Sequence, residues 1–274
     1  MGISRSKRQN NSGEISMSIK LINSEIVKSG IISVTINNDK KKNALSEEIK
    51  IGMTKLAEEI SENSAISVVI LSGVKGNFSA GNDVTESSSF SKGKSLIEAR
   101  RHNRLGLKMC NAWTNIPQIT IASIEGVCVG GGLSLALSCD FRICSPDALL
   151  WVPEVDLGIT YSWGSIPKLV AMVGPSKAKL IVLACEKINA KMSLEWGLCE
   201  SIDDDPFNIA LKMANDLAQK PSVPQQMAKE SINRQYRIFN DFGLYEQDQV
   251  LLNLSSHETQ NLLNNIKNKL KNKS

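Results

Sequence analysis

The segment Ile124–Asp140, IEGVCVGGGLSLALSCD, constrains this chain more than any other. The apolar run that precedes it, from Gln118 to Ile124, predicts a strand, and the pattern of Leu133–Cys139 predicts a short helix. Between them lie Gly130, Gly131 and Gly132. Glycines let a ligand approach bare backbone, and the first N–H groups of a helix have no partner within that helix. The segment therefore predicts a site for a phosphate, or for a negative oxygen that develops during a reaction.

Composition restricts the classes of protein that this chain can belong to. Its 274 residues allow one large core or two modest domains, and 42% hydrophobic with 22% charged residues is usual for a globular protein. A net charge of +4 is too small to indicate nucleic acid as a partner. No apolar run approaches the ~18 residues of a membrane span. Residues 1–17 have no apolar stretch typical of a secretory signal, and we expect a disordered or tag-like segment there and a basic tail at 267–274.

The cysteines and histidines do not form a metal-binding pattern. None of the six cysteines belongs to a CxxC pair, and their apolar or helical surroundings predict buried, reduced thiols. This favours a reducing, cytoplasmic compartment. The only histidines, His102 and His257, lie in polar helical stretches, so we expect both at the surface.

The order of the expected elements predicts an α/β fold. Two strands, in 19–27 and 30–36, precede a helix capped by Ser46, and 66–71 predicts a buried strand. A polar stretch, 85–94, predicts a mobile surface loop before a helix at 95–114. Short strands are expected at 140–145 and 149–152. Helices follow at 165–173, 176–184, 193–196, 206–218, 223–239 and 246–265.

Two glycine-centred loops, Phe78–Asp83 and Val129–Gly132, each follow a predicted strand. Neither matches GxGxxG, the dinucleotide-binding pattern, and neither ends in the Lys-Ser/Thr pair of a phosphate loop. A GxSxG motif is also absent, which argues against a serine hydrolase.

Three motifs, FSAGND, IEGVCVGGGLSLALSCDFRI and WVPEVDLGI, in this order and spacing resemble the crotonase (enoyl-CoA hydratase/isomerase) superfamily. NNDKKKNALS also fits, with Asp39 where proline is common, as do KMSLEWGLCESI and MAKESIN. The resemblance covers roughly Ile19–Asn240. It implies a crotonase-like spiral of ββα units over 18–215, then a helical oligomerisation region over 216–266, in a homotrimer or homohexamer. Leucines of the last helices, at 251, 252, 254, 262 and 263, predict packing against a partner chain.

The same resemblance implies which residues bind an acyl-CoA thioester. The backbone N–H groups of Asn82 and Gly131 would hold the thioester oxygen, where the charge of an enolate collects. Further family positions would contact the substrate: Ala80, Gly81, Asp83, Gly130, Gly132, Ser134, Tyr161 and Trp163. Coenzyme A is part of this substrate, and no separate cofactor is expected. The polar loop with Lys40, Lys41 and Lys42 matches the place where the family approaches coenzyme A.

Glu154 falls on a catalytic glutamate position of the family. Its apolar neighbours Trp151, Val152, Val155 and Leu157 would partly desolvate it. Desolvation raises the pKa of a carboxyl group and makes it a competent proton acceptor and donor near neutral pH.

The departures from the family pattern distinguish between reactions. Hydratases carry a second glutamate where this chain has Ser134, and dienoyl-CoA isomerases carry an aspartate near Ser162. A single carboxylate suits the transfer of a proton from C2 to C4 of a 3-enoyl-CoA, so an enoyl-CoA isomerase is our first hypothesis. A 2-enoyl-CoA hydratase is the alternative.

Two further alternatives remain at this stage. Tyr161 occurs where decarboxylases of the family can carry a tyrosine, although those enzymes do not usually keep an acid at Glu154. A CoA-binding protein without turnover is the non-enzymatic alternative. We expect the acyl pocket to use the segment 85–108 and Trp163.

Overall fold

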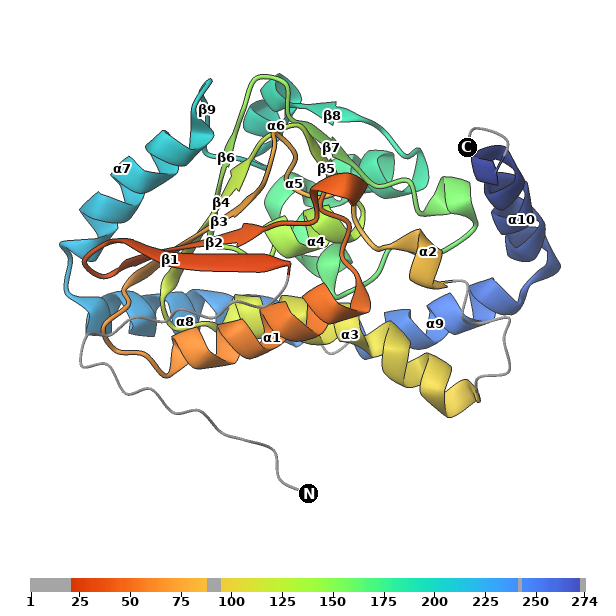
Figure 1. The fold of residues 1–274 in the computed structure, drawn as a ribbon, viewed down its shortest axis with the longest axis horizontal. Coiled ribbons are helices and arrows are strands. Elements are labelled where there is room, and N and C mark those ends of the chain that lie inside the picture. The colour runs from red at the N-terminus through yellow and green to blue at the C-terminus, as the bar shows by residue number, and fades with distance from the viewer. Residues whose placement is uncertain (1–20, 88–94, 241–242, 272–274) are drawn as a thin grey trace.

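The computed structural model describes residues 21–87, 95–240 and 243–271 (Figure 1). Its main sheet has the strand order β1-β2-β3-β4-β6-β9. β1 (Ile22–Lys28) is antiparallel to β2 (Ile31–Ile36), and every later neighbour is parallel. The parallel strands are β2, β3 (Val68–Gly73), β4 (Ile119–Ile124), β6 (Phe141–Cys144) and β9 (Ser201–Ile202). Their carboxyl ends therefore meet at one edge of the sheet.

Helices cover both faces of this sheet. α7 (Pro206–Ala218) packs on β3, β4 and β6, where Val68, Ile70 and Ile121 are buried against it. α1 (Glu47–Ser61) and α3 (Leu96–Asn115) pack together on the opposite face (Figure 1). Alternate residues of a strand point to opposite faces, so β3, covered on both, needs the continuous apolar run that its sequence shows.

Local sequence explains where α1 and α3 begin. The Ser46 hydroxyl accepts a hydrogen bond from the Ile49 N–H, as expected from the sequence. The apolar positions of α1 are fully buried, namely Ile49, Met53, Leu56 and Ile60. Ser95 and Glu98 form a reciprocal capping box at the start of α3.

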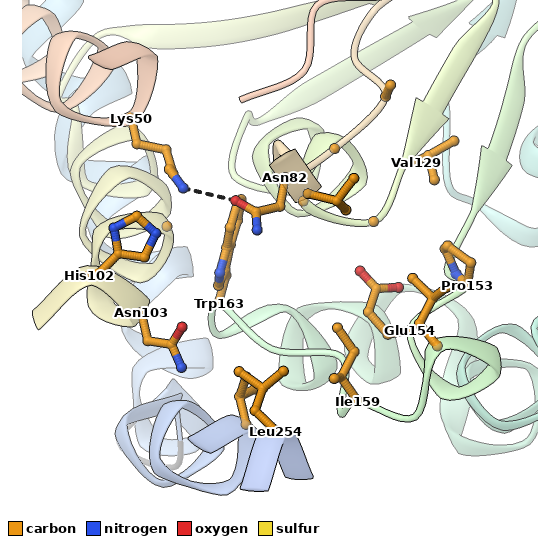
Figure 2. A pocket seen from close by; sticks show the side chains of 18 of the residues that line it. Lys50, Asn82, His102, Asn103, Val129, Pro153, Glu154, Ile159, Trp163 and Leu254 are labelled. Atoms are coloured by element: carbon orange, nitrogen blue, oxygen red, sulfur yellow. Dashed lines mark hydrogen bonds between the residues drawn. The ribbon is translucent and has the colours of Figure 1, made fainter. Parts of the chain in front are cut away.

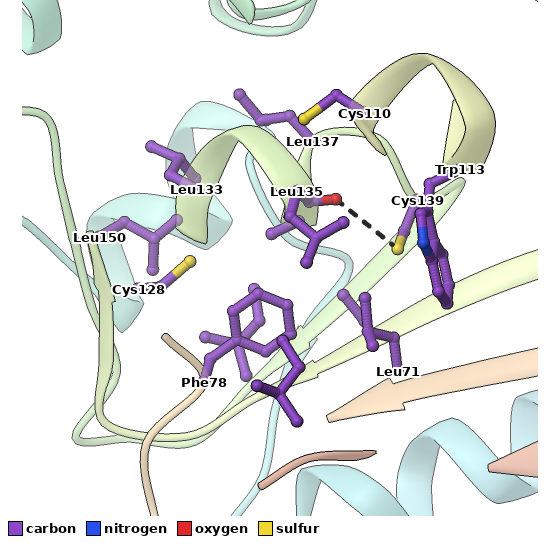
Figure 3. Packing of buried hydrophobic residues seen from close by; sticks show 14 of the residues in the cluster. Leu71, Phe78, Cys110, Trp113, Cys128, Leu133, Leu135, Leu137, Cys139 and Leu150 are labelled. Atoms are coloured by element: carbon purple, nitrogen blue, oxygen red, sulfur yellow. Dashed lines mark hydrogen bonds between the residues drawn. The ribbon is translucent and has the colours of Figure 1, made fainter. Parts of the chain in front are cut away.

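A second, three-stranded sheet carries the glycine segment. β7 (Leu149–Trp151) lies between β5 (Val127–Val129) and β8 (Ile188–Asn189). α4 (Gly131–Ala136) follows β5 and packs Leu133 and Leu135 into the core near Phe78, Cys128 and Leu150 (Figure 3). The loop expected between residue 124 and the glycines thus contains a strand, β5. All six cysteines are free and buried, as expected.

Helices form the remainder of the described chain. α5 (Ser165–Leu183) is kinked at Gly174, where the sequence predicts two helices. The other helices include α2 (Val84–Ser87), which precedes α3. They also include α6 (Ala190–Trp196) and α8 (Ser222–Asn240), which follow α5. α8 is fixed to the sheet by Lys229, whose ammonium donates to Asp140 Oδ2 at 2.6 Å and to the Gln118 carbonyl at 2.7 Å. None of the helices in the described ranges combines the length and hydropathy needed to cross a bilayer.

The C-terminal region differs from the sequence prediction in two ways. The single helix expected at 246–265 is wrong: α9 (Gly243–Ser255) and α10 (His257–Lys271) are separated at Ser256. The Ser256 hydroxyl donates to the Asn253 carbonyl and accepts from the Thr259 N–H, so it ends one helix and caps the next. The leucines that the sequence predicts to face a partner chain do not all lie at the surface. Leu251 is buried within the chain and Leu252 is 71% exposed.

Several sequence predictions fall on segments that the structure does not describe. These are the N-terminal segment 1–17, most of the predicted surface loop, 88–94, and the end of the basic tail, 272–274.

Candidate active site

Three distant segments of the chain form the floor of a pocket. The loop 78–83 lies between residues 42–45 and β5. On one side, the Ala80 N–H donates to the Lys42 carbonyl at 2.9 Å, and Gly81 O accepts from the Leu45 N–H at 2.7 Å. On the other side, the Ser79 N–H donates to the Val127 carbonyl at 2.9 Å. The backbone of this loop is therefore held on both sides, as in a sheet.

This pairing determines the direction of the Asn82 amide. Leu45 bonds to the residues before and after Asn82: its N–H donates to Gly81 O, and its carbonyl accepts from Asp83 N at 3.2 Å. Successive amides of an extended strand alternate in direction, so the Asn82 N–H points away from Leu45. The opposite side is where β5 leads into α4.

Gly81 shows how closely the two glycine loops approach. A β-carbon at Gly81 would be 2.5 Å from the Val129 carbonyl oxygen and 3.3 Å from the Gly131 nitrogen. Only a residue without a side chain fits there, and the φ of +88° also requires glycine. The amides that follow the first loop and begin α4 therefore lie on adjacent backbone segments.

Each glycine of the triplet has a different neighbour. A β-carbon at Gly132 would be 2.6 Å from the Ser79 carbonyl oxygen, and one at Gly131 would be 2.4 Å from the Trp163 ring. At Gly130 it would be 2.5 Å from Glu154 Oε1. The triplet thus brings backbone, an aromatic ring and a carboxylate into contact with the start of α4, where the Gly131 N–H lies in the first turn.

Glu154 is the acidic group of this site. It precedes the short 3-10 helix Val155–Leu157, which turns its carboxylate toward Gly130. Its Oε2 is buried and has no hydrogen-bond partner among the described residues. Burial raises the pKa of Glu154 to about 7, in the direction expected from its apolar neighbours.

These groups line one pocket, a cavity of about 200 Å³ (Figure 2). Glu154 is the only carboxylate among the described residues that line it. The lining also includes apolar side chains from α9 and α10, namely Val250, Leu254 and Leu263. Within the described ranges, no group of three His, Cys, Asp or Glu side chains is arranged to hold a metal ion.

Trp163 divides this pocket. Its φ is +65°, which is unusual for a residue with a side chain, and its indole ring fills the space above two glycines. A β-carbon at Gly106 of α3 would lie 1.9 Å from the ring, and one at Gly131 would lie 2.4 Å from it. In Figure 2 the ring stands between Glu154 on one side and Lys50, His102 and Asn103 on the other.

Comparison with known proteins agrees with this geometry. The sequence profile of the family described as enoyl-CoA hydratase/isomerase matches residues 27–271. The chain belongs to the enoyl-CoA hydratase/isomerase family. Such proteins, of the crotonase superfamily, are enzymes of acyl-CoA metabolism, and this chain is therefore an enzyme of that kind.

Individual relatives carry names for more than one reaction of the family. The chain is 33% identical over 220 residues to a short-chain-enoyl-CoA hydratase of Clostridium acetobutylicum, covering 79% of this chain and 83% of the relative. It is 31% identical over 182 residues to a peroxisomal Δ3,5-Δ2,4-dienoyl-CoA isomerase of Arabidopsis thaliana, covering 64% and 66%. A crystal structure of an enoyl-CoA hydratase/isomerase from Acinetobacter baumannii, described as putative, superposes with a TM-score of 0.83 at 23% identity. It covers 90% of this chain and 98% of that one, which shows a shared crotonase fold.

Most of the family positions predicted from the sequence meet at the pocket. Those that line it are Ala80, Gly81, Asn82, Gly130, Gly131, Glu154 and Trp163. Four others, Asp83, Gly132, Ser134 and Tyr161, are not among its lining residues.

The four positions outside the lining have structural contacts instead. Burial acts to raise the pKa of Asp83, but hydrogen bonds from Lys41, at 2.6 Å, and Thr85 outweigh it and lower that pKa. The Ser134 hydroxyl donates to the Tyr161 hydroxyl at 3.1 Å, and Tyr161 is 1% exposed. Burial and the nearby Glu154 raise the pKa of Tyr161 well above its usual value. These two hydroxyls are therefore buried and hydrogen-bonded to each other, outside the pocket lining.

Sequence reasoning missed several residues that line this pocket. The expectation that His102 lies at the surface is wrong, because its side chain is 18% exposed and lines the pocket. Its position one turn before Gly106, on the face of α3 that also holds Ala99, was an available signal. Lys50 lies on the buried face of α1 together with Met53 and Ala57. The side chains of Val250, Leu254 and Leu263 reach the pocket from the C-terminal helices, and only the tertiary fold reveals that placement.

Proposed function

We propose that this enzyme isomerises a 3-enoyl-CoA to a 2-enoyl-CoA, with Glu154 as the group that moves the proton. The observation that carries this proposal is that Glu154 is the only carboxylate among the described residues of the pocket lining. Burial raises the pKa of Glu154 to about 7, so it can both accept and return a proton at neutral pH.

The reaction needs one proton acceptor and one oxyanion site. The Glu154 carboxylate removes a proton from C2, and the electron pair moves onto the thioester oxygen to form a dienolate. The N–H groups of Gly131 and Asn82 stabilise that oxygen by hydrogen bonds, which strengthen as its charge develops. The electrons then return, the double bond moves to C2–C3, and the proton on Glu154 is transferred to C4. Coenzyme A belongs to the substrate, and the reaction needs no further cofactor.

Two backbone features support this oxyanion site. The Asn82 N–H points away from Leu45, and Gly81 brings its loop against the Gly131 nitrogen. Backbone donors do not depend on the side chain, which is why asparagine is compatible with position 82.

A 2-enoyl-CoA hydratase is the second candidate, favoured by the 33% identity to the clostridial short-chain-enoyl-CoA hydratase. Water addition in this family uses a second carboxylate, where this chain has Ser134. The Ser134 hydroxyl is buried and bonded to Tyr161, so it neither replaces an acid nor lies in the pocket lining. The same burial removes Tyr161, the residue on which the decarboxylase alternative depends, from that lining.

A product assay distinguishes these reactions. Purified protein is offered trans-3-hexenoyl-CoA and crotonyl-CoA, and products are followed by ultraviolet absorbance and mass spectrometry. We expect rapid formation of the 2-enoyl thioester from the first and little hydration of the second. Faster hydration than isomerisation would establish the hydratase instead.

Two variants locate the proton transfer. Glu154→Gln keeps the shape of the side chain and removes its proton acceptor, and we expect a loss of about 10³-fold or more in kcat. Asp156→Asn is the matched control, because Asp156 is an exposed carboxylate two residues away. Equal losses in both variants would contradict the role of Glu154.

A further inference from the structure

The indole ring of Trp163 lines the pocket, but the proposed proton transfer does not use it. A β-carbon at Gly131 would lie 2.4 Å from this ring, so the ring rests on the backbone whose N–H we propose as a donor to the thioester oxygen. An acyl group bound at that N–H would begin beside the ring. The ring is therefore in a position to restrict how far the acyl chain extends.

Two glycines on different helices make room for the Trp163 ring. Gly106 lies in the interior of α3, where glycine is an unfavourable residue. A β-carbon there would lie 1.9 Å from Trp163 Cε2, and one at Gly131, the first residue of α4, would also overlap the ring. Even a methyl group at either position would displace the indole. The place of the ring is therefore built into two separate elements of the fold.

The backbone and a buried cation hold the Trp163 ring in this place. The φ of Trp163 is +65°, and Gly164, the residue before α5, has a φ of +71°. Left-handed backbone is costly for a residue with a side chain and persists only where the surrounding structure enforces it. Lys50 Nζ lies 5.8 Å from the centroid of the ring, a distance typical of a cation–π contact. The same ammonium donates to Asn82 Oδ1 at 2.8 Å, so the ring is linked to α1 and to the first glycine loop.

The part of the pocket that contains Glu154 is small. Val129, Pro153 and Ile159 lie on the same side of the Trp163 ring as Glu154 and provide apolar walls (Figure 2). The cavity on both sides of the ring together measures about 200 Å³, whereas pockets for small molecules usually have ~300–1,000 Å³. The part on the Glu154 side therefore has room for a short hydrocarbon chain.

We propose that Trp163 sets the upper limit of acyl-chain length and that this enzyme prefers short-chain acyl-CoA thioesters. The thioester oxygen would lie at Gly131 with C2 beside Glu154, and a longer chain would meet the indole ring. To pass, that chain would have to displace the ring from its contacts with Gly106 and Gly131. This inference rests on the proposed function, because it assumes that the thioester oxygen binds at Gly131. It does not depend on which reaction follows the binding of the thioester.

A purely structural role for Trp163 makes a different prediction. If the ring only fills space between α3 and α4, its removal weakens the binding of all acyl-CoA thioesters to the same degree. If the ring ends the acyl subsite, its removal frees space between Gly106 and Gly131 for further methylene groups. The preference between chain lengths then changes. The ratio of two dissociation constants therefore separates the two roles.

The test measures binding rather than turnover. Isothermal titration calorimetry compares butyryl-CoA with octanoyl-CoA on the full-length chain, and neither thioester has a double bond to move. We expect the wild type to bind butyryl-CoA more tightly by about 10-fold or more, and Trp163→Ala to lower the ratio of the octanoyl-CoA to the butyryl-CoA dissociation constant by about 10-fold or more.

Two further variants serve as controls. Trp196→Ala removes an indole that also has a lysine, Lys177, 5.3 Å from its centroid but that does not belong to the described pocket lining, and it should keep the wild-type ratio. Trp163→Phe keeps an aromatic ring and should retain most of the wild-type preference. Circular dichroism of each variant verifies that it is folded.

The possible results have distinct meanings. An equal ratio in the wild type and Trp163→Ala, or a wild type that binds octanoyl-CoA as tightly as butyryl-CoA, overturns the inference while the proposed function stands. Failure of the folded wild type to bind either thioester contradicts the proposed function and the inference together. Should Trp163→Ala not fold, Trp163→Leu, which keeps an apolar but smaller side chain, is expected to lower the same ratio, and an unchanged ratio in that variant overturns the inference.

Discussion

Oε1 of Glu154 lies so close to Gly130 that a β-carbon on this glycine would be 2.5 Å from it. The φ of Gly130, +51°, also disfavours any other residue. We expect Gly130→Ala to displace the carboxylate and to lower kcat/KM about 100-fold or more. Gly174→Ala is the control, because Gly174 has a similar φ of +75° but open space around it. Comparable losses of activity in both variants would show that backbone strain, rather than displacement of Glu154, is responsible.

The pKa of Glu154 predicts how the rate depends on pH. The carboxylate must be ionised to accept a proton, and burial raises its pKa to about 7. We expect kcat/KM for a 3-enoyl-CoA to rise from pH 5, bend near pH 7 and remain level above it. Steady-state rates between pH 5 and 9 measure this profile. A bend near pH 4.5, the ordinary value for glutamate, would mean that the carboxylate is solvated when the enzyme works.

The same pKa predicts a pH-dependent stability. The folded-state pKa, about 7, lies above the unfolded value of 4.5, so the folded protein resists ionisation of Glu154. Its free energy of unfolding therefore falls as pH rises from about 4.5 to about 7, and the full cost applies above that range. Glu154→Gln removes this cost, and we expect it to be more stable than the wild type at pH 8, by roughly 1–3 kcal/mol. Urea unfolding should show the difference shrinking toward pH 5. A constant difference at both pH values would contradict ionisation as its cause.

The buried ion pair between α8 and the sheet predicts a loss of stability. Lys229 Nζ lies 2.6 Å from Asp140 Oδ2, and the two side chains are 7% and 19% exposed. Lys229→Met leaves a largely buried carboxylate without its cation, which costs about 3–5 kcal/mol. Urea unfolding measures this against Lys212→Met, an exposed lysine on α7, for which we expect little change. A loss no larger than that of the control would mean that water solvates Asp140.

Exposed apolar side chains support the expected trimer or hexamer. Leu183 on α5 is 63% exposed, and Val223, Met227 and Ile232 on α8 are 65%, 64% and 58% exposed. Burial of such groups between subunits would be favourable. Light scattering coupled to size exclusion should give three or six times the mass of one chain. A monomer at micromolar concentration would contradict the prediction.

Regular elements were predictable where local signals were strong. The cap at Ser46, the continuous apolar run of β3 and the proline at the start of α7 locate their elements to within two residues. β8 and β9 have only two residues each, which is too short for any periodicity. The break at Ser256 depends on a cap inside an otherwise helical pattern, and that pattern obscured it.

The site was predictable only where backbone chemistry left a motif. The glycine loops and Glu154 follow such motifs, and the structure places them at one pocket. Lys50 and His102 carry no motif, because their role at the pocket comes from the packing of α1 against α3. Ser134 stands at a family position, but only the fold shows that its hydroxyl is turned toward Tyr161.

The floor of the pocket joins backbone from residues 42–45, 78–83 and 127–131. Backbone hydrogen bonds connect Leu45 to Gly81 and Ser79 to Val127. Each contact closes a loop of more than thirty residues, and such contacts form late because their entropic cost precedes their gain. The amides of Asn82 and Gly131, which we propose as the oxyanion site, therefore come into register only after these long-range contacts have formed. After dilution from denaturant, activity should therefore return later than the helical circular dichroism signal, and its rate should report the last step of folding.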